Sequence, residues 1–572
     1  MSLLGALHTG GSSLAAQQAA LQVTGNNISN AGTAGYSRQV VDLASTGPAD
    51  IGNGQYTGNG VGVQSIERQV DAALNESVRG ATSDQSSAQT SNSVLSQLET
   101  TFGALNDNDL ASRMTDFFNS FSTLANNPSD AGQRAVVIQN GSTLASYLQQ
   151  LRSQVSTIGA NLDSQVTSNA QQANSLVNQI ASLNKQIAST GTAGIGATNA
   201  LLDQRDQDLT QLAGLMDIKV IDQGGGNLNV LVGGMPVVEG TVSRGVQVGT
   251  TTDANGNLVQ QLQFADNGDN MNVSGGTLGA LLTAQSQDVT PALNEIDSIA
   301  AGLIQAVNQI HTQGQGSAGF TSVTGTTQVT DPTAALNAPT TTTGITFPPT
   351  NGTFNLYITD SSGQTTTQQI TVNLSGQGTQ TTLNSLAAGI TAAGGGTVSA
   401  TVDSSGHLQV SSSDPNVTFG FGDDTSGALA SLGVNTFFSG KNASDIAVNS
   451  VLTNNPDYLA TGRDNVAGSN RNAQALALAG SAAVASLGGK SVQDSYAAYT
   501  ADLATKTQTA SDSVTATTSI YQSLYAQQQS ISGVSLDEEA INLTQYQRAF
   551  EGSARFINVV NQMMETVMTL IQ

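Results

Sequence analysis

Apolar residues recur every seven positions at both ends of the chain. The N-terminal repeat is Leu7, Leu14, Leu21 and Ile28, and the C-terminal repeat is Leu536, Leu543, Phe550, Ile557, Met564 and Ile571. One apolar residue per heptad, with others three or four positions away, predicts a helix that carries one apolar face. We therefore expect a helix in each segment, with these residues as the candidate assembly interface.

The two repeats differ in how readily they should fold. Gly5, Gly10, Gly11 and Gly25 interrupt the N-terminal repeat, and each lowers helix stability by about 1 kcal/mol relative to Ala. The C-terminal repeat starts at residues 535–538 (Ser-Leu-Asp-Glu), a capping box that favours a helix start. We expect the isolated N-terminal segment to be largely unfolded, and both chain ends to become ordered only when they pack on each other and on neighbouring subunits. An intramolecular bundle is the competing interpretation, but ordinary domains fray at their ends, which favours assembly.

A third repeat predicts the longest helix. Residues 127–130 (Asn-Pro-Ser-Asp) supply a stop followed by a candidate N-cap. From there to about residue 190, apolar side chains recur with heptad spacing, beginning with Val137, Leu144, Leu151 and Ile158. At 1.5 Å per residue this helix would be roughly 90 Å long, and it cannot bury its apolar stripe alone. Its expected partners lie in residues 65–102, 108–125, 277–312 and 490–530.

The hydrophobic period shortens to two after Met216, which predicts strands. Alternating residues flank the glycines at 224–226 and the Asp-Ala-Asn-Gly sequence at 253–256, and both patterns predict hairpins. Two more predicted hairpins share the turn sequence Asp-Ser-Ser-Gly, at 360–363 and 403–406, with a short helix between them. The region of about 320–440 is therefore expected to form a compact β-rich domain.

These patterns together predict an α+β multidomain protein in which β-rich domains are inserted into a helical bundle. A length of 572 residues agrees with several domains, since one core stops growing at roughly 250–300 residues. The expected division is an inner-core helix and loop at 1–60, a helical bundle with hairpins near 217–272 at 61–320, an outer β-rich domain at 321–440, a return to the bundle at 441–530, and a C-terminal coiled-coil helix at 531–572.

The amino-acid composition argues against several kinds of binding partner and several kinds of site. The chain has 17 Lys and Arg against 41 Asp and Glu, a net charge of −24. This acidic balance argues against nucleic acid and against an anionic membrane as partners. Cysteine is absent, which excludes disulfides and Cys-ligated zinc. No run of 18 apolar residues would span a membrane, and the absence of a basic residue before Arg38 argues against a secretory signal.

Three patterns that could carry chemistry have simpler explanations. The G-x-G-x-x-G sequence at 314–319 follows a predicted helix and no strand, so we interpret it as a linker. The carboxylates at 537–539 suit the first turn of a helix. Asp414, Asp423 and Asp424 lack the spacing of a calcium loop, and the three histidines show no metal-ligand spacing. We therefore predict no catalytic site, no cofactor and no metal.

Motifs near both ends resemble those of the flagellar rod, hook and hook-associated protein family. The N-terminal motif consists of Asn26, Asn27, Ser29, Asn30, Thr33, Gly35, Tyr36 and Arg38. Ala34 stands where the family usually has Pro, which would pre-set the backbone of that turn. Residues 532–550 are similar to the family's C-terminal motif. Internal stretches at 124–134, 199–206 and 307–311 are similar to members found at the junction of hook and filament.

The resemblance implies a structural subunit with no enzymatic role. It implies export through the flagellar type III apparatus in an unfolded state, which fits the lack of cysteine. It further implies assembly of copies of the chain into a ring between hook protein and hook-associated protein 3. A cytoplasmic export chaperone would cover the C-terminal helix, since a free apolar face of that length invites premature association.

Three other functions remain open from the sequence. The chain could be another tube subunit of the same family, such as hook protein. A secreted peptidoglycan hydrolase would need a cleft with perturbed carboxylates, which no segment suggests. An adhesin would use the β-rich domain to bind a receptor. Deletion of about 320–440 separates the last alternative from a junction subunit, because assembly should survive the deletion while attachment should fail.

Overall fold

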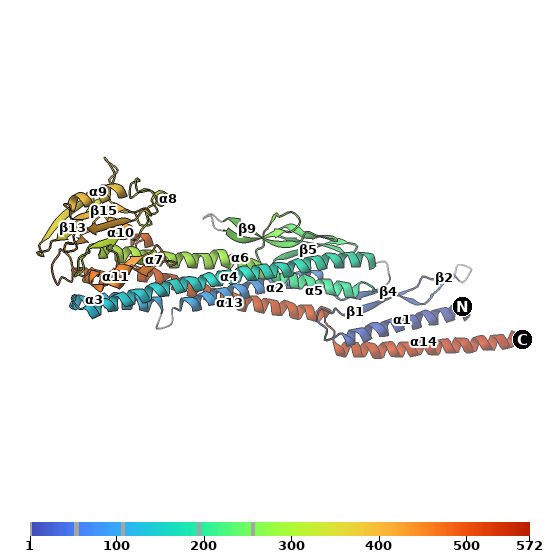
Figure 1. Ribbon diagram of the computed structural model, residues 1–572. Helices are drawn as coiled ribbons and strands as arrows, with labels where there is room; N and C mark the ends of the chain where they lie inside the picture. The colour runs from blue at the N-terminus through green and yellow to red at the C-terminus, as the bar shows by residue number, and fades with distance from the viewer. Residues whose placement is uncertain (1–2, 51–55, 104–108, 191–195, 253–257, 572) are drawn as a thin grey trace. The chain divides into compact units, whose positions relative to one another are not determined.

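The computed structural model describes residues 3–50, 56–103, 109–190, 196–252 and 258–571. Long helices alternate along the chain with small antiparallel sheets (Figure 1). The predicted α+β class is therefore confirmed. Within these residues no single helix is long and apolar enough to cross a bilayer. One bent pair, at 471–487 and 492–570, passes that test by length and composition only.

The chain divides into two compact units, each built from separate stretches of sequence. The first unit consists of Met1–Ser93, Asn161–Ala284 and Thr509–Gln572, and the second of Val94–Ala160 and Gln285–Gln508. Most boundaries fall inside helices, namely α2 (Ala72–Phe102), α4 (Ala131–Thr190) and α13 (Val492–Ser532). The division into five segments made from the sequence stays a prediction.

The predicted long helices are present. Helix α4 runs without interruption for 60 residues, and its heptad residues Val137, Leu144 and Leu151 are buried. The four segments expected to supply its partners also contain helices: α2, α3 (Leu110–Asn126), α6 (Gly276–Ala284) with α7 (Thr290–His311), and α13. A π-helical turn at Gln285–Val289 separates α6 from α7.

The first unit contains the helices nearest the chain ends and two small sheets. Helices α1 (Leu3–Ser29) and α14 (Leu536–Ile571) lie side by side (Figure 1). A hairpin of β1 (Gln39–Ser45) and β4 (Val61–Arg68) packs on α1, and β2 (Ala49–Asp50) pairs with β3 (Tyr56–Thr57) farther out. Val41 of β1 contacts Ala20 and Val23 of α1 in a small apolar cluster.

Two further sheets of the first unit follow helix α5 (Asn199–Leu215). One has four strands in sequence order, β5 (Ile218–Gly224), β6 (Asn227–Val232), β7 (Met235–Glu239) and β8 (Val242–Ser243). The other contains β9 (Val246–Thr252), β10 (Leu258–Phe264) and β11 (Asn270–Met271). The pairing of β5 with β6 confirms the hairpin predicted around residues 224–226. Strands β9 and β10 also pair, but the turn predicted between them at 253–256 lies outside the described residues.

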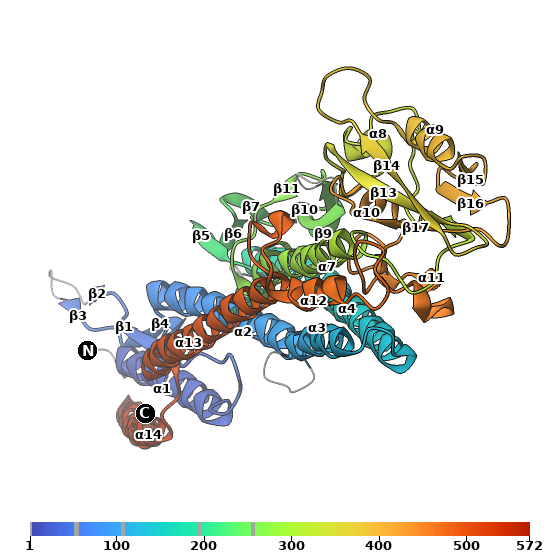
Figure 2. The ribbon, with the colours of Figure 1, turned by 90° about the vertical axis from the view of Figure 1, so that its left-hand side faces the viewer.

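The second unit carries the predicted β-rich domain. Its first sheet consists of β14 (Thr365–Val372), β13 (Gly352–Thr359) and β17 (Thr418–Gly422), and its second of β12 (Ser322–Thr324), β16 (Leu408–Ser412) and β15 (Val398–Val402). Helix α9 (Leu383–Ala393) lies beside β15 and also contacts β14 (Figure 2). The apolar core of this domain draws on residues from Phe320 to Val434. Both hairpins with the Asp-Ser-Ser-Gly turn are present.

Short elements complete the second unit. They are α8 (Thr340–Thr343), α10 (Ala428–Leu432), β18 (Phe438–Ser439), β19 (Ala447–Val448), α11 (Ser450–Asn454), α12 (Arg471–Ala477) and three short 3₁₀ turns, at Pro456–Tyr458, Ala479–Ser481 and Ala485–Leu487. Phe117 and Phe121 of α3 pack against Phe437 with ring centroids 5.2 and 5.7 Å apart. This aromatic cluster joins the segment that follows the β-rich domain to the helices.

Candidate assembly site at the chain ends

Helices α1 and α14 form an antiparallel pair. The hydroxyl oxygens of Ser13 and Ser553 are 2.8 Å apart, and the Asn27 side chain reaches Glu539. At the other end of α1, Gly10 lies against Ile557. These contacts place the start of α1 beside the C-terminal half of α14. The last two turns of α14 therefore extend past Leu3.

Small residues allow the two helices to approach closely. Among the described residues of α1, the buried ones are Gly10, Ala16, Ala20, Val23, Thr24 and Asn27. A Cβ atom at Gly10 would lie only 2.7 Å from Cγ1 of Ile557. Gly10 weakens the isolated helix, but it gives α14 the room that a larger side chain would take. The sequence indicated that this glycine lowers helix stability, but it did not indicate that the glycine allows α14 to approach closely.

The predicted interface residues are brought together on this helix pair. Leu7, Leu14, Leu21 and Ile28 of α1 are half-buried, as are Leu543, Phe550, Ile557 and Met564 of α14. Leu536 is exposed at the first turn of α14. The side chain of Ile571 lies outside the described residues. The role of these residues in assembly stays a prediction.

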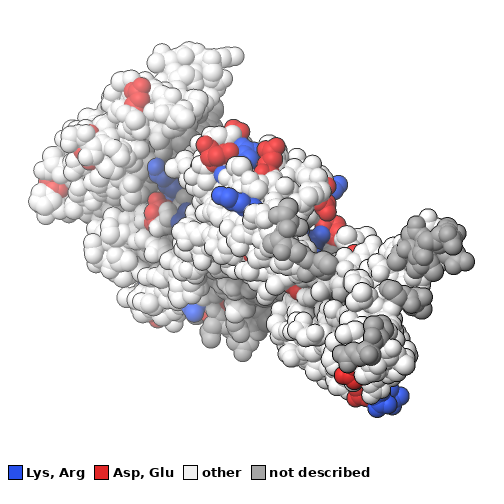
Figure 3. Space-filling model, turned by 90° about the vertical axis from the view of Figure 1, so that its right-hand side faces the viewer, with Lys and Arg blue, Asp and Glu red and all other residues white. Residues whose placement is uncertain are grey.

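Helix α14 has a second apolar stripe that the heptad repeat did not reveal. Phe556, Val559, Met563, Val567 and Leu570 follow each other three or four positions apart and are between 41% and 79% exposed. Such spacing places them on one side of the helix. Most of the surface seen in Figure 3 carries neither acidic nor basic side chains.

A buried polar network links the N-terminal motif to the start of α14. Asn27 is almost fully buried, and all of its side-chain hydrogen-bonding groups are used. Its Oδ1 accepts from the Tyr36 hydroxyl at 2.8 Å and from the Gln39 N–H at 3.0 Å. Its Nδ2 donates to the Gln39 carbonyl at 2.9 Å and to Glu539 Oε2 at 3.1 Å.

Arg38 extends this network to the corner between α13 and α14. Its Nε donates to Glu539 Oε1 at 2.9 Å, and its Nη1 lies 2.9 Å from Glu538 Oε2. Its backbone N–H donates to the carbonyl of Ser532, the last residue of α13, at 2.9 Å. From the sequence, the acidic residues at 537–539 were explained by their position in the first turn of a helix. That explanation is incomplete, because it does not account for the hydrogen-bond and ion-pair partners of Glu539.

The other motif residues shape the loop that carries Tyr36 and Arg38. Asn30 Nδ2 donates to the Asn26 carbonyl at 3.0 Å, and the Thr33 hydroxyl donates to Asn30 Oδ1 at 3.2 Å. Gly35 has a φ of +82°, a left-handed conformation that favours glycine. Burial, aided by nearby carboxylates, raises the pKa of Tyr36 to about 12, so its hydroxyl keeps its proton at neutral pH. Ser29 is exposed.

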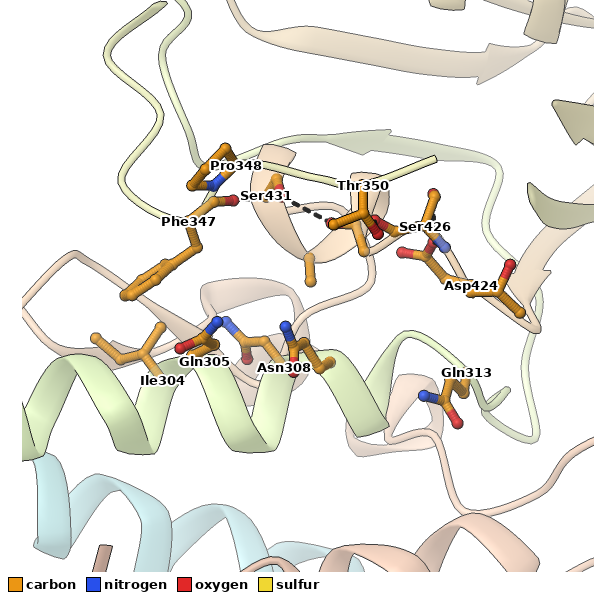
Figure 4. A pocket seen from close by; sticks show the side chains of 14 residues that line it. Ile304, Gln305, Asn308, Gln313, Phe347, Pro348, Thr350, Asp424, Ser426 and Ser431 are labelled. Atoms are coloured by element: carbon orange, nitrogen blue, oxygen red, sulfur yellow. Dashed lines mark hydrogen bonds between the residues drawn. The ribbon is translucent and has the colours of Figure 1, made fainter. Parts of the chain in front are cut away.

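The second unit contains a cavity that is a candidate site for chemistry. It measures about 220 Å³ and lies between α7 and the loop that contains Phe347 and Thr350 (Figure 4). The Asp424 carboxylate at its edge accepts from the Ser426 hydroxyl at 2.8 Å and from the Leu429 N–H at 2.9 Å. The Asp424 carboxylate thus stabilises the turn to which it belongs. Among the described residues, no group of three His, Asp or Glu side chains could hold a metal ion.

Comparisons with known proteins connect these features. Residues 95–326 match the family model "Flagellar hook-associated protein FlgK helical domain". Residues 7–36 match "Flagella basal body rod protein", and 527–570 match "Flagellar basal body rod FlgEFG protein C-terminal". The last two matches contain Asn27 and Tyr36 on one side of the buried network and Glu539 on the other, and Arg38 lies two residues beyond the first match.

Curated relatives align over nearly the whole chain. Flagellar hook-associated protein 1 of Salmonella typhimurium is 30% identical, and the alignment covers 98% of each chain. The protein of the same name from Escherichia coli is also 30% identical over 98% of each chain. A solved structure, the flagellar hook junction protein FlgK from Burkholderia pseudomallei, shares the fold with a TM-score of 0.52 and 18% identity, covering 80% of this chain and 100% of that one.

Proposed function

The chain belongs to the flagellar hook-associated protein 1 family, a structural component of the bacterial flagellum, and we propose that it joins the hook to the filament. In this proposal copies of the chain form a ring between hook protein and hook-associated protein 3. The full-length alignment to curated relatives supports this over a role as hook protein. The proposed location is the junction itself, outside the cell.

The observation that carries the proposed assembly mechanism is the uncovered stripe of α14. Helix α1 and the polar network cover one side of α14, and the exposed stripe from Phe556 to Leu570 lies next to that side, with Phe556 at its border beside Gly10. Full burial of such a side chain contributes roughly 1.5–3 kcal/mol, so covering five half-exposed ones would favour association substantially. The same residues in a neighbouring copy have the matching apolar character.

The export part of the proposal follows from the same stripe. An exposed apolar face of this length on a subunit waiting for export would promote premature association. We infer that a cytoplasmic chaperone covers α14 before the chain passes through the type III apparatus. The absence of cysteine agrees with export of an unfolded chain, since no disulfide has to be opened.

We also propose that the chain has no catalytic activity. The family is a structural one. At the cavity in Figure 4 the buried carboxylate of Asp424 is held by hydrogen bonds from its own turn, so it is poorly placed to exchange a proton with a substrate. A zymogram for peptidoglycan hydrolysis would detect the competing activity.

Phe556→Asp tests assembly through the stripe. A carboxylate there would have to be desolvated in the interface, so we expect bacteria that carry this variant to make hooks without attached filaments, counted by electron microscopy. Asn558→Asp is the matched control, because it adds the same charge to an exposed position of α14 away from the stripe. Normal filament numbers with Phe556→Asp would contradict the proposal, provided that the variant is exported.

A further inference from the structure

Glu539 occupies an unusual place for a charged residue in the first turn of a helix. Its side chain is only 2% exposed, whereas that of its neighbour Glu538 is 61% exposed. Both carboxylates bind Arg38, at 2.9 Å each. An acidic residue near a helix start is ordinarily stabilised by backbone N–H groups while it remains in water. Glu539 instead directs its carboxylate to two side chains of the N-terminal motif.

The partners of Glu539 lie more than 500 positions earlier in the chain. Asn27 lies in the last turns of α1, and Arg38 directly precedes β1. Arg38 also accounts for one carbonyl at the end of α13, because its N–H donates to Ser532. The carboxylate therefore sits where the end of α1, the start of β1 and the corner between α13 and α14 meet.

The surroundings leave little freedom at this point. The Asn27 side chain is fixed by four hydrogen bonds, so its Nδ2 has one direction in which to meet Glu539. The Arg38 guanidinium is shared between the two glutamates. A buried carboxylate whose partners are removed is left uncompensated, which is far less favourable than the loss of an exposed ion pair. The two glutamates should thus differ greatly in importance although they contact the same arginine.

We propose that Glu539 is the positioning residue that locks the α1–α14 pair onto the end of α13, and that this lock is required for assembly. The inference rests on the proposed function, since it assigns a residue to the assembly step. Without the lock, α14 stays helical and apolar but its direction relative to α13 is no longer fixed. Neighbouring copies then cannot place their stripes in register.

Glu539→Gln and Glu538→Gln make a matched pair for the test. Each removes one negative charge from the first turn of α14 and keeps the size of the side chain. In the purified full chain, we expect Glu539→Gln to speed tryptic cleavage at Arg38, Arg548 and Arg555 at least tenfold, while Glu538→Gln stays within twofold of wild type. In bacteria, Glu539→Gln should lose filaments and Glu538→Gln should keep them.

Amide exchange distinguishes a lock from a general loss of stability. With Glu539→Gln, the amides of α14 and α1 should exchange faster while those of α7 in the second unit keep their wild-type rates. Tyr36→Phe provides a milder variant, since it removes only the hydroxyl that donates to Asn27. It should loosen α14 by an intermediate factor, so the inference can be tested even if Glu539→Gln does not accumulate.

The outcomes separate this inference from the proposed function. If Glu539→Gln matches Glu538→Gln in cleavage and in filament number, the lock does not exist, whatever Phe556→Asp does. If Glu539→Gln loosens α14 and filaments still form in wild-type numbers, the lock exists without a role in assembly, and the proposal is overturned. If Phe556→Asp assembles normally, the proposed use of the stripe fails, and the cleavage data on Glu539 still stand.

Discussion

His311 acts as a neutral group buried in the second unit. Its Nδ1 lies 2.8 Å from the Asn435 carbonyl, and its Nε2 accepts the Ala460 N–H at 3.1 Å. Because Nε2 is an acceptor, the proton of the neutral ring belongs on Nδ1. Protonation of Nε2 would break the bond to Ala460 and charge a group without water around it. Burial accordingly lowers the pKa of His311 to about 4.

This depressed pKa predicts a loss of stability in acid. The ring titrates near pH 6.5 in the unfolded chain, so its contribution is complete above that value and is lost as the pH falls toward 4. The loss should approach about 3 kcal/mol. We expect urea unfolding of the second unit to show this slope in wild type and in His407→Gln, and to lack it in His311→Gln. Equal slopes in all three proteins would rule the assignment out.

The same region shows what a sequence can reveal at the scale of single residues. In the sequence, residues 307–311 stood out only by their similarity to the flagellar family, and no local pattern indicated what these side chains contact. Asn308 Oδ1 accepts the N–H groups of Phe437 and Phe438, at 3.0 and 2.9 Å, across about 130 positions of sequence. Asn27 and Glu539 are likewise 512 positions apart. No local pattern encodes such pairs, so their partners could not be predicted.

At the scale of elements, a pair of adjacent glycines tests the α1–α14 contact. Gly10→Ala would bring a methyl group to 2.7 Å from Ile557, while no described atom lies within 4 Å of a Cβ built at Gly11. Overpacking costs roughly 1–3 kcal/mol, against a gain of about 1 kcal/mol in helix propensity. We expect Gly10→Ala to speed amide exchange in α1 and α14, and Gly11→Ala to slow it or leave it unchanged. The reverse order would contradict the packing described for this pair.

Elements with strong periodicity were predictable from the chain. The bounds of α4 follow the Asn-Pro-Ser-Asp stop and the heptads, and α14 begins where the capping box indicates. The close seam of α1 was not predictable, because the large heptad residues attracted attention while small residues occupy the most buried positions. The exposed stripe from Phe556 to Leu570 was not predicted, because it overlaps the heptad repeat in the same helix and the heptad repeat is longer and more regular.

At the scale of the whole molecule, the β-rich domain should be separable from assembly. Its apolar core lies within residues 320–434, and Asn435, which contacts His311, falls just outside. Replacing 320–434 with a short Gly-Ser linker should leave filament numbers unchanged in electron micrographs. The loss of the stacking between Phe320 and Tyr458, at 4.4 Å, should lower the melting temperature by a few degrees.

An adhesin would respond differently to the same deletion. Attachment of cells to a surface would fall while filaments persisted, which would assign receptor binding to the domain. Loss of filaments from a deletion variant that is exported and retains the helices of the second unit by amide exchange would show instead that the domain takes part in assembly.

The hairpin tips of this domain have a practical consequence. In the turn between β13 and β14, the Asp360 carboxylate accepts from the backbone N–H groups of Ser362 and Gln364, so the ends of the turn are held by local bonds. Exposed tips of this kind tolerate inserted sequence. In the proposed ring, a foreign epitope grafted there would be repeated once per copy, so the chain would serve as a scaffold for displaying antigens on the flagellum.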